Sequence, residues 1–165
     1  MTFESAIFRE IMSHYPTGVS VIASRTAEGE AIGMTVGTFT SVSLAPPLIG
    51  FFPDKRSTSW PKIAATGHFC VNILAHDQEL LCRKFSGAER DRFSEVTHRF
   101  SQNGLPILDG AVAWIDCDIF SVQEAGDHLF VLGEVKAMDA ERTASPLVFH
   151  RGKFGQVTCV EVVAA

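Results

Sequence analysis

The chain has 165 residues, of which 46% are hydrophobic and 20% charged, and its formal net charge is −5. This size and apolar content allow one sizeable core, so we expect a single domain over residues 1–165. The acidic balance, without any basic block, argues against a nucleic-acid partner. No run of 18 apolar residues and no signal-peptide pattern occurs. We therefore expect no membrane span and a cytoplasmic protein.

Cysteine and histidine spacing argues against a metal site. The four cysteines are far apart and form no Cys-x-x-Cys pair, and the six histidines show no ligand spacing. Free buried thiols in a reducing compartment are the simplest interpretation. Thirteen phenylalanines stand against a single tyrosine, so large apolar rings can fill a barrel or a dimer contact, and tyrosine acid chemistry is disfavoured.

The N-terminal third predicts a helix followed by a β-hairpin. Apolar residues recur at three- and four-residue spacing over residues 3–15, with Thr2 and Ser5 as possible caps, and Pro16 ends this helix. Residues 18–24 and 31–36 alternate as strands around a turn at residues 27–30.

Residues 32–43 combine five hydroxyl side chains with two glycines, directly ahead of an apolar strand at 47–52. A strand meant only for burial would be rich in valine and isoleucine, so these hydroxyls either face water or bind something. Backbone beside Gly37 can approach a flat ligand closely. The residues alone leave two interpretations open, an exposed capped turn and a ligand-binding edge.

The next loop, residues 54–61, carries two cations and three hydroxyls ahead of a helix at 59–66. Ser57 or Thr58 can cap that helix, whose positive end favours an anion. The loop therefore suits a phosphate, and equally an ordinary capped surface helix. Gly67 ends the helix, and residues 68–74 read as a strand.

The second half predicts mostly strands. Asp77 is expected to cap a helix over 77–85, and residues 87–104 read as a long polar loop with one helical turn. Strands follow at 113–122 and 128–138, separated by a turn at 123–127, and the tail 156–165 reads as one strand. At least six strands and few helices favour a mainly β fold, a barrel.

Several motifs together resemble the short-chain flavin reductases, the reductase partners of two-component flavin-dependent monooxygenases. The resemblance covers residues from about 8 to 155. It rests on Gly33-Met34-Thr35, Phe39-Thr40-Ser41-Val42-Ser43, Pro46-Pro47-Leu48, Arg56-Ser57 with Trp60, the Asn72 strand, Gly126-Asp127-His128 and Pro146 to Gly155.

The resemblance implies a split Greek-key β-barrel of the FMN-binding type with a few short peripheral helices. It also implies a homodimer with flavin sites near the subunit contact. NADH or NADPH would donate hydride to FMN or FAD, and the reduced flavin would pass to a separate oxygenase. No Rossmann fingerprint occurs, so neither the nucleotide nor the flavin can be chosen from sequence.

The same resemblance assigns site residues by position. The flavin ring and ribityl edge would contact Met34, Thr35, Val36, Gly37, Thr38, Thr40 and Ser41. The phosphate would contact Lys55, Arg56, Ser57 and Thr58. Asn72, Lys84 and Phe85 would flank the flavin. The nicotinamide would contact His128, Arg151, Gly152 and Phe154, with His128 as the candidate catalytic residue, orienting the nucleotide without proton transfer.

Three positions depart from the family pattern. Cys82 stands where a serine is common, and a thiol is a weaker hydrogen-bond partner than a hydroxyl. Lys84 replaces an arginine and loses its bidentate fork. Phe154 replaces a tyrosine.

More conservative interpretations remain for single residues. Asn72 suits a hydrogen-bonded interior position, His128 a turn, and Arg151 an exposed hairpin turn. At the level of function, the rivals are an oxidase of the related pyridoxine-phosphate-oxidase-like barrels and a non-catalytic FMN-binding or electron-carrying protein.

Overall fold

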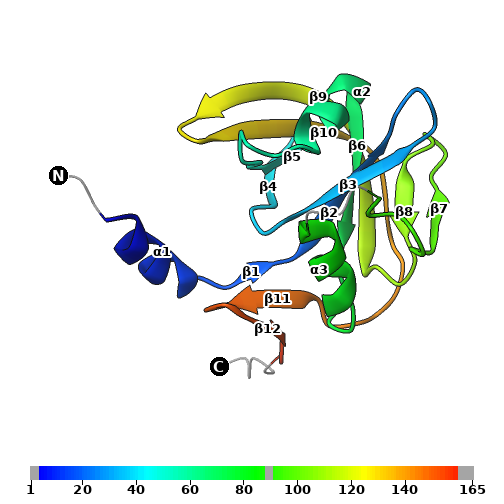
Figure 1. Ribbon diagram of the computed structural model, residues 1–165. Coiled ribbons are helices and arrows are strands. Elements are labelled where there is room, and N and C mark those ends of the chain that lie inside the picture. Colours follow the sequence, from blue (N-terminus) through cyan, green and yellow to red (C-terminus); the bar gives the residue numbers. More distant parts are fainter. Residues whose placement is uncertain (1–3, 88–90, 160–165) are drawn as a thin grey trace.

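The computed structural model describes residues 4–87 and 91–159 and shows a mainly β protein with three short helices among them (Figure 1). The helices are α1 (Ser5–Ser13), α2 (Trp60–Thr66) and α3 (Glu79–Ser86). The first six strands are β1 (Thr17–Gly18), β2 (Ser20–Arg25), β3 (Ala31–Val36), β4 (Thr40–Leu44), β5 (Pro47–Phe51) and β6 (His68–Ile73). The others are β7 (His98–Phe100), β8 (Pro106–Leu108), β9 (Ala113–Ala125), β10 (His128–Ala140), β11 (Leu147–His150) and β12 (Lys153–Gln156).

Seven strands form one antiparallel sheet in the order β3-β2-β6-β9-β10-β5-β4. Its edge strands β3 and β4 follow one another in the chain, yet they lie at opposite edges and do not pair. The sheet curves around its apolar face, as Figure 1 shows. This is the expected split barrel, and the expectation of a mainly β fold is confirmed. Two smaller sheets, β1-β11-β12 and β7-β8, complete the fold.

The core has two main clusters that share strand β2. Ile22 lies in one cluster with Phe51, Phe69 and Trp60, and its neighbour Val21 faces the other. Because adjacent side chains of a strand point to opposite faces, β2 separates the two clusters and contacts both. Inside the barrel the Phe51 ring meets Trp60 and Phe69 edge to face, with centroids 5.6 and 5.2 Å apart.

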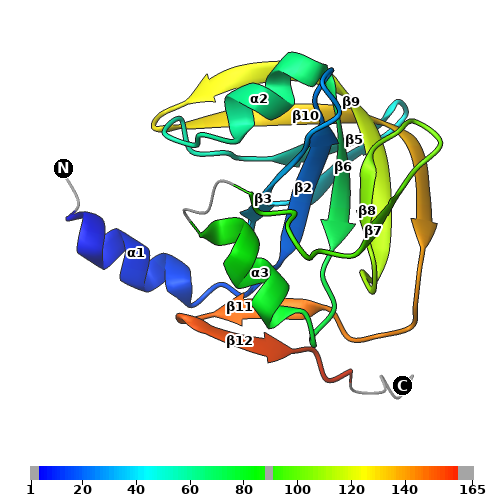
Figure 2. The same ribbon diagram turned by 45° about the vertical axis from the view of Figure 1, so that its right-hand side comes forward.

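The N-terminal helix α1 extends away from the barrel in both views (Figure 2). It has no buried residue, and its apolar side chains are about half exposed or more. It begins at Ser5 after Glu4, without a side-chain capping bond, so the expected role of Ser5 as a cap is wrong. Thr2 lies outside the described residues. No helix among the described residues is long and apolar enough to cross a membrane.

Some local predictions were wrong. Strand β4 occupies residues for which only a turn or a ligand edge was expected, because pairing with β5 satisfies their backbone. Asp77 does not cap α3; the helix starts at Glu79 and Asp77 pairs instead with Arg142. The polar segment after α3 contains strand β7. The strand expected over residues 156–165 is wrong for the described part of the tail, because β12 ends at Gln156 and residues 157–159 form no strand; positions 160–165 lie outside the described residues.

Asn72 has a structural role inside this fold. Its side chain on β6 is fully buried, its Nδ2 donates to the carbonyl of Pro106 at 3.1 Å, and its Oδ1 accepts from the N–H of Leu108 at 2.8 Å. The amide therefore fixes β8 to the sheet. This matches the interior interpretation of Asn72, since both polar atoms of its amide hydrogen-bond to the backbone within the fold.

We expect Asn72→Ala to lower the free energy of unfolding by about 2–4 kcal/mol, because two buried backbone groups lose their partners and a cavity remains. Chemical denaturation at fixed protein concentration measures this, with Gln102→Ala, an exposed change in the same β7–β8 connection, as the control. A loss no larger than that of the control would show that the amide contributes little.

Candidate functional site

Two segments expected to bind ligands meet at one end of the barrel. The loop after β5 contacts the turn between β9 and β10 through backbone bonds, from the N–H of Lys55 to the carbonyl of Asp127 and from that of Leu129 to Pro53, each 3.0 Å. An isolated bridge also joins Asp54 to His128. The predicted phosphate loop and the predicted nicotinamide residue are therefore neighbours, although some 70 residues separate them in sequence.

Both cations of this loop have carboxylate partners. Arg56 donates two hydrogen bonds to Asp54, from Nε to Oδ1 at 3.1 Å and from Nη2 to Oδ2 at 2.7 Å. The Nζ of Lys55 lies 3.3 Å from Oε2 of Glu124. The bond from Arg56 holds the pKa of Asp54 well below its usual range, so this carboxylate stays charged at neutral pH. Such exposed pairs are weak and can be exchanged for a ligand phosphate.

His128 is held by its neighbour in the turn. Its Nδ1 lies 2.8 Å from Oδ1 of Asp127, and this contact lowers the pKa of Asp127. The ring is 40% exposed as a side chain, so it is accessible while its orientation is fixed by a carboxylate.

Helix α2 offers less to an anion than its sequence indicated. The N-cap residue is Ser59, without a side-chain capping bond, so the expectation that Ser57 or Thr58 caps this helix is wrong. The hydroxyl of Ser57 does accept the N–H of Trp60, the first helical residue, at 3.1 Å. Thr58 is exposed. The helix has only seven residues, and Pro61 in its first turn has no N–H. Any phosphate contact here would come from the loop side chains more than from the helix end.

The hydroxyl-rich stretch divides into a buried and an exposed half. Met34 and Val36 are buried in the barrel core, and Thr35 donates its hydroxyl to the carbonyl of Cys82 at 3.1 Å. The exposed half comprises Gly37, Thr38, Thr40 and Ser41. The Thr38 hydroxyl accepts the N–H of Phe52 at 2.9 Å, directly beside the phosphate loop. Only this exposed half can present backbone and hydroxyl groups to a ligand.

Helix α3 contributes mainly packing. Phe85 is buried, and its ring meets Phe93 edge to face at 5.0 Å over the backbone of Gly33. A Cβ at position 33 would come within 2.7 Å of the Phe85 ring, so this close approach requires glycine. Lys84 is partly buried and donates to the carbonyl of Ser94. Burial raises the pKa of Cys82, so its thiol is an inert packing group.

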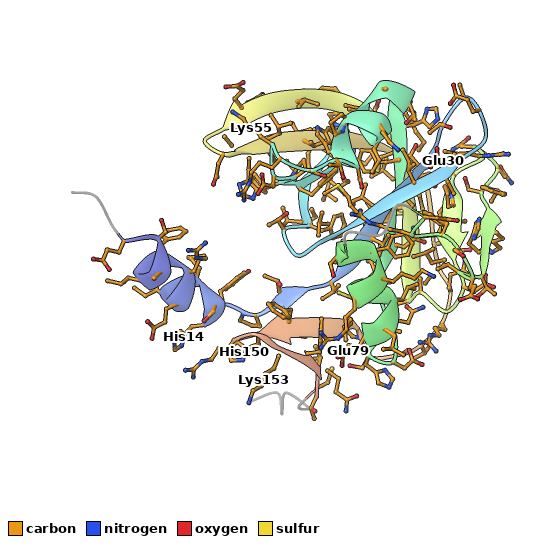
Figure 3. All side chains as sticks on the ribbon, in the orientation of Figure 1. His14, Glu30, Lys55, Glu79, His150 and Lys153 are labelled. Carbon is orange, nitrogen blue, oxygen red and sulfur yellow. The ribbon has the colours of Figure 1, made fainter. Side chains whose placement is uncertain are left out.

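The C-terminal candidates lie elsewhere in the chain. Arg151 and Gly152 form the turn between β11 and β12, and Phe154 on β12 packs against Phe149, with Arg83 over its ring at 5.1 Å. In Figure 3, Lys55 lies beside the β9–β10 hairpin, whereas His150 and Lys153 lie on the β11–β12 hairpin at the other side of the molecule. One chain therefore does not bring Arg151 and Phe154 to His128.

Sequence reasoning missed Arg92. Its Nη1 donates to the carbonyl of Gly33 at 3.0 Å and to Oγ of Ser59 at 2.7 Å, and its Nη2 donates to the carbonyl of Gly87 at 2.7 Å. These partners border three of the expected ligand-binding segments. A single arginine in a polar loop gives no periodic or spacing signal, so nothing in the sequence distinguishes it from a solvated charge.

Among residues 4–87 and 91–159, no group of three or more histidine, cysteine, aspartate or glutamate side chains is placed to hold a metal ion. Three of the cysteines are buried and Cys159 is exposed, all as free thiols. Burial raises the pKa of Cys117 to about 12 and that of Cys70 further, because neighbouring Asp116 adds to the effect of desolvation. These buried thiols are therefore unsuited to ionise as nucleophiles or metal ligands.

Comparison with known proteins identifies the family. The model of the flavin reductase like domain matches residues 12–158. A flavin reductase of Pseudomonas putida is 51% identical over 148 residues, covering 90% of this chain and 87% of that protein. The reductase subunit HsaB of a flavin-dependent monooxygenase from Rhodococcus jostii is 38% identical over 147 residues, covering 89% and 75%.

A solved structure agrees over nearly the whole chain. The NADH:FAD oxidoreductase SgcE6 of Streptomyces globisporus, in complex with NAD and FAD fragments, superposes with a TM-score of 0.88 at 32% identity, covering 94% of this chain and 93% of that one. The resemblance found in the sequence motifs is thereby confirmed, and the chain belongs to the flavin reductase like family.

Proposed function

We propose that this protein, as one flavin reductase-like domain over residues 1–165, is an NAD(P)H-dependent flavin reductase that supplies reduced FMN or FAD to a separate monooxygenase. One observation carries the proposal. The loop that suits a phosphate, the Gly126-Asp127-His128 turn and Thr38 of the hydroxyl-rich stretch meet at one end of the barrel. Relatives named as flavin reductase and as the reductase subunit of a monooxygenase support it.

The residues present fit a flavin phosphate and ring edge. Residues 37–41 offer exposed backbone and hydroxyl groups, and Thr38 joins them to Phe52, just before the loop that carries Lys55 and Arg56. The carboxylate partner of Lys55, Glu124, is exposed and that of Arg56, Asp54, is partly exposed, so both pairs can exchange for a ligand phosphate. The bound flavin would supply an acceptor at N5 for the hydride of NADH or NADPH. The protein's task is then to stack the two rings with donor and acceptor about 3–3.5 Å apart, and His128 orients the nicotinamide.

Not every expected site residue keeps a direct role in this proposal. Asn72, Phe85, Met34 and Val36 are buried, so we assign them to the framework of the site. Thr35 and Ser57 are engaged in bonds within the chain, and Lys84 donates to a backbone carbonyl. Direct flavin contacts are proposed for the exposed group: Gly37, Thr38, Thr40, Ser41, Lys55, Arg56 and Thr58.

We also propose a homodimer. Helix α1 exposes Ile7, Phe8, Ile11 and Met12, and Tyr15 just after the helix extends this apolar stripe; their exposed fractions lie between 49% and 69%. Such a stripe is costly in water and is typical of a subunit contact. A second copy would also offer a way to place Arg151, Gly152 and Phe154 of one chain near the nucleotide bound by the other. The cytoplasmic location stays a prediction.

The direct test is NADH and NADPH oxidation by the purified protein, with and without added FMN, FAD or riboflavin. We expect nucleotide oxidation that requires added flavin and saturates with its concentration, because flavin accepts the hydride and leaves as the reduced product. A yellow protein that oxidises neither nucleotide would overturn the proposal and favour an oxidase. Flavin binding without any nucleotide-dependent reduction under anaerobic conditions would favour a carrier.

We expect His128→Ala to raise KM for NADH about tenfold while flavin affinity changes less than twofold, because about 1.4 kcal/mol of nucleotide contact is lost. Steady-state kinetics and flavin fluorescence titration measure the two effects. His76→Ala, a change at an exposed histidine outside this end of the barrel, is the control. An unchanged KM for NADH would remove His128 from the nucleotide site.

Arg56→Ala should weaken FMN about two- to fivefold and leave riboflavin unaffected, because riboflavin has no phosphate. Asp54→Asn should strengthen FMN binding, since it releases Arg56 from its carboxylate. Arg99→Ala, which breaks a similar pair with Glu141, is the control. Equal losses for FMN and riboflavin in Arg56→Ala would place the phosphate elsewhere.

A further inference from the structure

Arg92 joins the three segments that frame the proposed flavin site. Its contact with Gly33 lies on β3, immediately before residues 34–41. Its contact with Ser59 follows the 55–58 loop, and its contact with Gly87 closes helix α3 after Lys84 and Phe85. These segments come from distant parts of the sequence and belong to no common pair of strands.

Few other polar contacts in the described chain could join these segments. Between β3 and residues 54–59 of the described chain, the other polar contact is the weak approach of the Ser57 hydroxyl to the sulfur of Met34 at 3.8 Å. Bonds from a guanidinium to neutral acceptors are charge-assisted and about twice as strong as neutral ones. The planar fork also fixes the angles between its partners, which a lysine cannot do.

The arginine is itself held from both sides. Oδ1 of Asp91 accepts the N–H groups of Phe93 and Ser94 at 3.2 and 2.9 Å, which fixes the turn that carries it. Phe93 packs on Phe85 and on the bare backbone of Gly33. The guanidinium is thus preorganised between β3 and α3.

The hydrogen bonding of the Arg92 guanidinium is incomplete. The Nε of Arg92 is buried and has no hydrogen-bond partner in the described part of the chain. An unpaired buried donor is destabilising. Arg142 shares this unpartnered Nε, but it forms an ion pair with Asp77, whereas the bonds of Arg92 all end on segments that frame the proposed site. This set of partners fits a role in positioning.

We infer that Arg92 is a positioning residue of the flavin site, which sets the distance between the hydroxyl-rich stretch and the phosphate loop without touching the flavin. This inference rests on the proposed function for its ligand. A flavin that spans both segments binds tightly only if their separation is fixed, so loosening the guanidinium contacts weakens flavin binding more than it slows hydride transfer once both substrates are bound.

The test compares Arg92→Met, which keeps the stem, with Arg92→Lys, which keeps the charge, and with Ser59→Ala, which removes one partner of the fork.

Arg142→Met is the matched control for arginine, because Arg142 also has a buried unpartnered Nε and one ion pair, with Asp77. Ser24→Ala is the control for serine, since Ser24 bonds Thr66 at the other end of α2. Each variant is measured for thermal stability, FMN dissociation constant, flavin KM and kcat.

We expect Arg92→Met to raise the FMN dissociation constant and the flavin KM tenfold or more, with kcat within threefold of wild type. Both constants of Arg92→Lys should lie between those of Arg92→Met and wild type. Ser59→Ala should raise both constants two- to fivefold. The controls should change the melting temperature without changing flavin affinity. If Arg92→Met does not fold, Ser59→Ala against Ser24→Ala decides the question.

Two results among the variants would overturn the inference. The first is unchanged flavin affinity in the folded Arg92 variants or, where these do not fold, in Ser59→Ala. The second is equal weakening in the matched controls, which would indicate a general loss of rigidity. Wild-type protein that binds FMN but oxidises no nucleotide would overturn the proposed reductase and leave this binding test intact. Wild-type protein that binds no flavin would overturn both.

Discussion

The curvature of the seven-stranded sheet is the constraint on which the rest of the molecule depends. The sheet bends around the rings of Phe51, Phe69 and Trp60, and a glycine facing these rings makes room for them. Gly133 is such a position: a Cβ there would lie 2.5 Å from the Phe69 ring and 3.0 Å from Cβ of Cys117. The register of β9 and β10 shifts beside Gly133, which bends the pair further.

The open edge of this sheet contributes to the site. Because β3 and β4 are the two edge strands and do not pair with each other, Gly37 and Thr38 in the connection between them stay exposed and present hydroxyl and backbone groups. The β9–β10 turn lies beside the loop after β5 because β10 pairs with β5, and the bridge between Asp54 and His128 continues that register. The proposed flavin site therefore lies where this strand pair ends and where the β3–β4 connection reaches the same loop through the bond between Thr38 and Phe52.

Charge at this end of the barrel is balanced. Lys55 and Arg56 each have a carboxylate partner, and the lowered pKa values of Asp54 and Asp127 keep these acids ionised at neutral pH. The phosphate of a flavin would replace these carboxylates as the partner of Lys55 and Arg56, so phosphate binding would add little net free energy. Such a site suits a flavin that leaves after reduction. This fits the proposed transfer of reduced flavin to a separate oxygenase better than permanent retention would.

The sequence by itself determined most strands of the seven-stranded sheet, the family and most of the candidate segments. Alternation over residues 113–122 and 128–138 predicted β9 and β10, and the Gly126-Asp127-His128 motif predicted the turn between them, because these signals are local. Local signals failed at β4, where pairing with another strand determined the structure. They also failed at Asp77, which forms an ion pair with the distant Arg142 and does not cap helix α3.

Only the tertiary structure decided which candidates can touch a ligand. Asn72 and Phe85 have side chains suited to a site, but β8 and Gly33 pack over them and place them in the core. Arg92 gave no signal in sequence, since its three partners lie 5 to 59 residues away. Burial and convergence of this kind are set by how the sheet closes. Residue type and spacing determine what each segment can form, and long-range packing determines which segments meet.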